Sequence, residues 1–143
     1  MTGFRSKKTE RRYTVDVHTL ESIPLFAGLS KKEREQVARW ADVVDVPAGH
    51  ALLEEGRFAH EFFVILDGVV EVTKDGVHLR DLGPGDFFGE IALVDHERRT
   101  ATVATTTPLR AVVMHARDFV EMRAKLPHVA HQIHEAIGRR PGR

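Results

Sequence analysis

The chain has 143 residues, of which 42% are hydrophobic and 29% charged, with 21 basic and 21 acidic side chains and no cysteine. This length suffices for one self-sufficient core, and the balanced charge argues against nucleic acid as the main partner. The lack of cysteine excludes disulfides and thiolate metal clusters and makes the cytoplasm the expected location.

The first segment, residues 1–14, is basic and is predicted to be a flexible, solvated arm. It lacks the apolar stretch of a signal peptide. No apolar run in the chain approaches the roughly 20 residues that cross a bilayer, so we expect no membrane partner.

The residue pattern over 17–42 predicts helices. Pro24 and Gly28 interrupt the first apolar spacing, which favours a short helix and a turn over one continuous helix. Ser30 and Glu33 have the spacing of a capping box, so a second helix should begin there and end near Asp42.

Residues 43–114 predict short antiparallel strands. The β-rich runs lie at 43–46, 51–54, 61–66, 69–74, 77–82, 100–105 and 109–114. Asp67-Gly68 and Asp75-Gly76 are hairpin signals, because both central turn positions need a positive φ, and together they predict an antiparallel meander. Turns at this spacing favour an antiparallel β-barrel or jelly roll. We therefore expect a mainly β fold with flanking helices.

Residues 116–138 predict two helices that form a C-terminal lid, because apolar residues recur at intervals of three and four. Pro127 should separate the two helices, and Gly138 should end the second, leaving residues 139–143 frayed. The apolar spacing would also suit association, so we expect a monomer or a homodimer through this helix. Too few residues follow the last strand for an added helix-turn-helix domain, so no DNA partner is expected.

The stretch around residues 83–103 carries the candidate binding residues. A Gly-Pro-Gly-Asp turn leads into Phe87 and Phe88, and Gly89 allows a ligand to approach the backbone closely. Residues 90–93 can form one helical turn whose free amides make an anion site, which the small Ala92 leaves open. Arg99 directly precedes a predicted strand, and a planar guanidinium is well suited to a phosphate.

Glu90 at the same helical turn would repel a free anion, so its presence needs a reason. A carboxylate can accept a hydrogen bond from a sugar hydroxyl, which suits a sugar-phosphate ring better than bare phosphate. Alternatively, Glu90 and Arg99 form a salt bridge that locks the loop. The residues alone leave both interpretations open.

The motif F-G-E-I-A-L, followed after five residues by R-T-A-T-V, resembles the phosphate-binding cassette of the cyclic-nucleotide-binding domain family. This family includes kinase regulatory subunits, gated channels and bacterial catabolite activators. The I-P-L-F-A-G-L-S motif at residues 23–30 and Gly68 also match, so the resemblance covers residues 15–138. It implies a non-catalytic, regulatory domain.

By this resemblance, Glu90 would bind the ribose 2′-hydroxyl, Arg99 the cyclic phosphate, and Thr100 the phosphate or the purine. The expected ligand-binding residues are Phe88, Gly89, Glu90, Ile91, Ala92, Arg99 and Thr100. The expected ligand is cyclic AMP first and cyclic GMP second, with no further cofactor. Binding would move the C-terminal helices over the base and signal to a protein effector.

Two alternatives belong to other classes of protein. The first is a structural domain of the same fold that binds no nucleotide. The second is a cupin-like metal enzyme, but that class needs a His-x-His pair, which this sequence lacks. His128, His131 and His134 drift around the predicted helix, which favours a solvated or interface role over a metal site.

Overall fold

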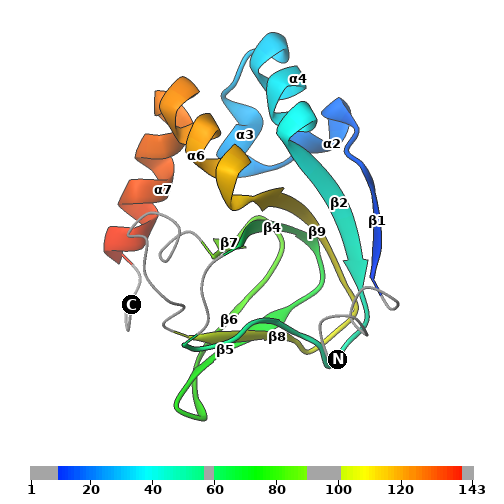
Figure 1. Cartoon of the computed structure of the whole chain (residues 1–143), viewed down its shortest axis with the longest axis vertical. Helices are drawn as coiled ribbons and strands as arrows, with labels where there is room; N and C mark the ends of the chain where they lie inside the picture. Colours follow the sequence, from blue (N-terminus) through cyan, green and yellow to red (C-terminus); the bar gives the residue numbers. More distant parts are fainter. Residues whose placement is uncertain (1–9, 57–59, 90–100, 140–143) are drawn as a thin grey trace.

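The computed structural model describes residues 10–56, 60–89 and 101–139, with side chains described as far as residue 136. Figure 1 shows two sheets that face each other, with helices covering the outer side of one of them. Mainly antiparallel sheets with flanking helices were predicted, and this fold class is confirmed. The described strands form two separate sheets and do not close into a barrel.

The larger sheet has five strands in the order β1-β2-β9-β4-β7, all paired antiparallel. These strands are β1 (Arg11–Thr14), β2 (Ala41–Val46), β9 (Leu109–His115), β4 (Glu61–Asp67) and β7 (Phe87–Phe88). The smaller sheet has four strands in the order β3-β8-β5-β6, namely β3 (Ala51–Leu53), β8 (Thr102–Thr105), β5 (Val70–Lys74) and β6 (Val77–Leu82).

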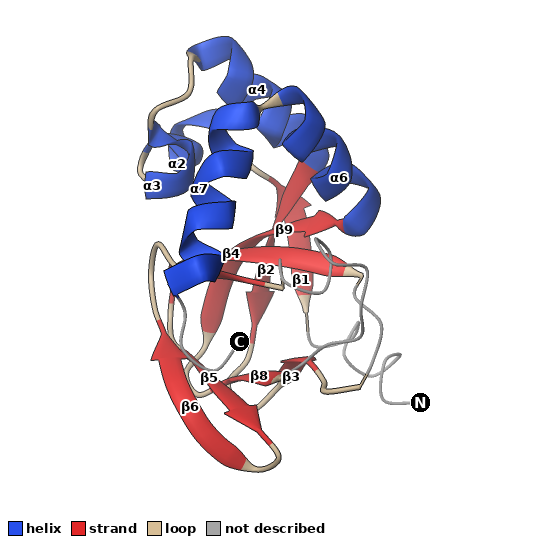
Figure 2. Cartoon of the chain, turned by 90° about the vertical axis from the view of Figure 1, so that its left-hand side faces the viewer, coloured by secondary structure: helices blue, strands red, loops and turns tan. Residues whose placement is uncertain are grey.

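In the described part of the chain, five helices lie on the outer side of the larger sheet (Figure 2). They are α2 (Val17–Glu21), α3 (Pro24–Ala27), α4 (Lys31–Trp40), α6 (Ala116–Lys125) and α7 (Pro127–Arg139). The predicted capping box is confirmed: Glu33 N donates to Ser30 Oγ at 3.1 Å, and Ser30 N donates to Glu33 Oε1 at 2.8 Å. Within the described ranges, none of these helices is long and apolar enough to cross a membrane.

Two apolar cores lie on opposite faces of the larger sheet. Its outward-facing residues, among them Val43, Phe62 and Val64, pack with the helices, and its inward-facing residues pack against the smaller sheet. This alternation follows from the two-residue period of a strand. Because both of their faces are buried, the neighbouring strands β4 and β9 are almost continuously apolar in their middle.

The structure corrects several predicted boundaries. The arm predicted as flexible over residues 1–14 ends in a strand, because Arg11–Thr14 pair with β2 as β1. The helix predicted to end near Asp42 stops at Trp40, since Ala41 already pairs with Met114. Pro127 separates α6 from α7 as expected, but α7 continues past Gly138 to Arg139.

One predicted hairpin is also wrong. Asp75 and Gly76 have φ values of 52° and 77° and form the expected tight turn between β5 and β6. At Asp67-Gly68, only the glycine has a positive φ, and β4 and β5 lie in different sheets. The pair Asp67-Gly68 therefore begins a crossover between the sheets, so the predicted meander is interrupted there.

Candidate functional site

Phe88 and Thr102 lie on either side of the segment that carries most of the predicted ligand-binding residues. Phe88 belongs to β7 in the larger sheet, and Thr102 begins β8 in the smaller one. The chain therefore passes from one sheet to the other between these two residues. Glu90, Ile91, Ala92, Arg99 and Thr100 lie outside the described residues, so their roles stay predictions.

A tight turn at residues 83–86 fixes the chain just before this segment. Asp86 N donates to Gly83 O at 3.0 Å, and Gly83 N donates to Asp86 Oδ2 at 2.9 Å. Gly85 has a φ of 91°, which suits glycine. Its N–H donates to Ile65 O at 2.8 Å, and Ile65 N donates to Asp86 O at the same distance. The predicted turn is thus present and is hydrogen-bonded to Ile65 of strand β4.

The two phenylalanines after the turn enter different cores. Phe87 packs on the helix side, where its ring lies 5.8 Å from that of Phe62. Phe62 in turn lies 4.7 Å from Phe119 of α6. Phe88 faces the space between the sheets and stacks on Phe63. An aromatic chain therefore connects the start of the candidate segment to the first C-terminal helix.

Gly89 comes next with a φ of 95°, in the left-handed region that side-chain-bearing residues rarely adopt. Glycine is therefore required here by backbone geometry, a reason that the sequence alone did not supply. Its expected contact with a ligand stays a prediction.

Strand β8, at the far end of the segment, is held firmly by Thr105. This side chain is only 2% exposed. Its hydroxyl accepts a hydrogen bond from His50 N at 2.9 Å and donates one to Pro47 O at 2.7 Å. These bonds fix β8 against the connection between β2 and β3, so both ends of the candidate segment are anchored to rigid structure.

The inner face of the smaller sheet forms one wall of the space between the sheets. It presents mainly apolar, buried side chains, those of Leu53, Val70, Val72, Leu82 and Val103. Arg80 is the exception that sequence analysis missed. It pairs with Val72 across the β5–β6 hairpin, so both side chains leave the same face of the sheet.

A bulge places Arg80 on the inner face. The register runs from Thr73↔His78 to Val72↔Arg80, which leaves Leu79 as the extra residue. Without this shift, the apolar Leu79 would oppose Val72. The sequence offered no clear signal for which side of β6 faces inward. Val77 and Leu79 alternate on one side of the strand, whereas Leu82 lies on the opposite side.

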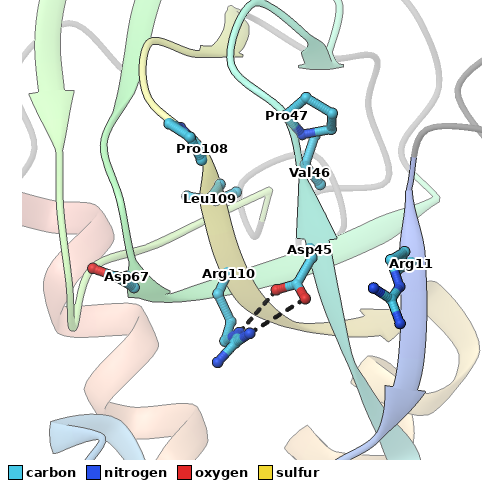
Figure 3. A pocket seen from close by; sticks show the side chains of 8 residues that line it. All are labelled: Arg11, Asp45, Val46, Pro47, Asp67, Pro108, Leu109 and Arg110. Atoms are coloured by element: carbon cyan, nitrogen blue, oxygen red, sulfur yellow. Dashed lines mark hydrogen bonds and ion pairs between the residues drawn. The ribbon is translucent and has the colours of Figure 1, made fainter.

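A separate groove of about 420 Å³ lies on the outer side of the larger sheet, near the end that the helices leave uncovered (Figure 3). Its lining consists of Arg11, Asp45, Val46, Pro47, Asp67, Pro108, Leu109 and Arg110. Arg110 binds the Asp45 carboxylate through Nε at 2.8 Å and Nη2 at 3.3 Å. Tyr13 Oη donates to the same carboxylate at 3.1 Å.

These contacts explain the electrostatics of the groove. The hydrogen bond from Arg110 lowers the pKa of Asp45, and the bond from Tyr13 acts in the same direction. Both oxygens of the carboxylate accept hydrogen bonds, so Asp45 is engaged in holding β1, β2 and β9 together. Within the described ranges, no group of three His, Asp or Glu side chains is arranged to hold a metal ion.

Comparison with known proteins finds one matching family model, described as the cyclic nucleotide-binding domain, over residues 43–125. Two of the curated relatives show the similarity in sequence. A cyclic nucleotide-gated potassium channel of Rhizobium etli is 30% identical over 142 residues, covering 99% of this chain and 40% of the channel. A cAMP-dependent protein kinase regulatory subunit of Aspergillus fumigatus is 36% identical over 93 residues, covering 64% of this chain and 22% of the subunit.

Solved structures share the fold. The catabolite activator protein of Thermus thermophilus has a TM-score of 0.72 at 27% identity, covering 82% of this chain and 57% of that one. The regulatory subunit of a cAMP-independent protein kinase A from Trypanosoma brucei has a TM-score of 0.77 at 22% identity, covering 94% of this chain and 47% of that one. This chain spans less than half of the curated relatives that it matches.

Proposed function

Because the chain belongs to the cyclic nucleotide-binding domain family, whose model matches more than half of its length, we propose that it binds a purine 3′,5′-cyclic nucleotide. The observation that carries this proposal is where the family match falls along the chain relative to the two sheets. The family match includes the whole of residues 88–103, and both ends of that stretch are fixed in opposite sheets. A ligand held by this segment would lie against the space between the sheets.

In this proposal, Arg99 binds the cyclic phosphate and Glu90 accepts a hydrogen bond from the ribose 2′-hydroxyl. Gly89, Ile91 and Ala92 offer backbone contacts. A bidentate guanidinium matches the phosphate oxygens, and the carboxylate is tolerated there because it meets a hydroxyl donor. Thr100 supplies a hydroxyl to the phosphate or the purine, and Phe88 adds apolar contact. The ligand candidates are cyclic AMP and cyclic GMP.

The domain acts as a non-catalytic sensor by shifting the population of two conformations. Ligand contact with residues 89–92 pulls on Phe87 and Phe88. Phe87 contacts Phe62, and Phe62 contacts Phe119 of α6, so a displacement there reaches the C-terminal helices through packed rings. Movement of α6 and α7 changes the surface presented to a protein effector.

Calorimetric titration of the whole chain with cyclic AMP and cyclic GMP tests the proposal. We expect saturable binding of at least one. Arg99→Ala should weaken binding by about 2–5 kcal/mol, because the buried charge of the ligand loses its partner. Arg98→Ala is the matched control, since it removes the neighbouring guanidinium of the same segment, and it should bind like the parent. Binding by Arg99→Ala as tight as the parent's would refute the phosphate assignment.

The movement of the helices has its own test. Hydrogen exchange of α6 and α7 should slow when the nucleotide is added, because closure protects backbone amides. The Phe119→Leu variant should retain binding but show a smaller change in exchange. Unchanged exchange throughout α6 and α7 at saturating nucleotide would contradict the sensor mechanism.

A second candidate function is a domain of this fold that binds no nucleotide. One structural relative, from Trypanosoma brucei, is named as part of a cAMP-independent kinase. The same titration separates the two candidates, since a folded chain that binds neither nucleotide would favour this one.

A further inference from the structure

We draw no further inference here: the strongest candidate, the groove of about 420 Å³ on the uncovered outer side of the larger sheet, carries no proposal because its Asp45 and Arg110 side chains already pair with each other and nothing in the structure shows what covers it.

Discussion

The rings of Phe63 and Phe88 are stacked, with centroids 4.9 Å apart and planes inclined by only 10°. Phe63 belongs to strand β4, and Phe88 is the last strand residue before the candidate segment. This stack therefore ties the start of the binding segment to an interior strand of the larger sheet. The position of Gly89, which is bonded directly to Phe88, depends on this stack.

We expect Phe88→Ala to destabilise the fold by about 3–5 kcal/mol, because it leaves a cavity between the two sheets. Phe88→Leu should cost less, since it fills part of that space. Urea unfolding measures both. Val77→Ala, at a side chain that is 62% exposed, is the control and should change stability by no more than about 0.5 kcal/mol. An equally small effect for Phe88→Ala would show that the stack is not important for stability.

Gly68→Ala tests the crossover between the sheets. A Cβ at this position would lie 2.3 Å from Pro108 O and 3.0 Å from Leu109 Cα, and the residue has a φ of 99°. Because the obstructing atoms belong to the backbone, the clash cannot be relieved by turning a side chain. We expect a loss of at least about 2 kcal/mol in the free energy of unfolding.

Gly76→Ala is the matched control for this crossover. Gly76 also has a positive φ, 77°, but no heavy atom beyond its own residue and its two chain neighbours lies within 4 Å of the position of its Cβ. The Gly76→Ala substitution should lower the free energy of unfolding only by the conformational penalty of a left-handed alanine, about 1–2 kcal/mol. The difference between the two variants in urea unfolding isolates the contact with Pro108. Equal losses would mean that this contact has no energetic weight.

Glu90→Ala addresses the predicted ribose contact. The variant should bind cyclic ribonucleotides more weakly, because the 2′-hydroxyl loses its acceptor. A 2′-deoxy analogue never makes that bond, so its affinity should hardly change. Calorimetry with each ligand and its 2′-deoxy form measures the difference. Equal losses for both forms would contradict the ribose role and favour the Glu90–Arg99 salt bridge.

The pair Asp45–Arg110 predicts a pH dependence of stability. The pKa of Asp45 is lowered in the folded state, first by the hydrogen bond from Arg110, from its usual value of 3.8. The stabilisation of the fold by the Asp45–Arg110 pair is therefore fully present above the usual pKa of 3.8, and it is lost as the pH falls through the lowered folded-state pKa. The effect should be small, because Arg110 is exposed and surface pairs contribute little.

Unfolding of the parent and of Asp45→Asn, measured at a series of pH values, tests this dependence. The parent should be the more stable of the two at neutral pH, and the two curves should converge in acid. A gap that widened as the pH fell would contradict the assigned direction of the pKa shift. Asp81→Asn, at an exposed carboxylate of β6, is the control and should follow the parent.

The sequence by itself determined the elements that depend on near neighbours. The capping box of Ser30 and Glu33, the break at Pro127 and the turn at Asp75-Gly76 all follow from residues a few positions apart. The class of the fold was predicted in the same way, because strand periodicity and turn chemistry are local properties. The cassette motif was identified by its resemblance to a known family, since the residues alone left the salt-bridge interpretation open.

Only the tertiary structure decided which strands pair. Asp67-Gly68 has the composition of a hairpin, yet the chain crosses there to the other sheet, and Gly68 fits because Pro108 leaves no room for a side chain. Residues 11–14 form a strand because the edge of β2 is available to them. Arg80 faces the interior because a bulge shifts its register against β5. Each outcome depends on contacts between residues far apart in sequence, and a local pattern does not encode their register.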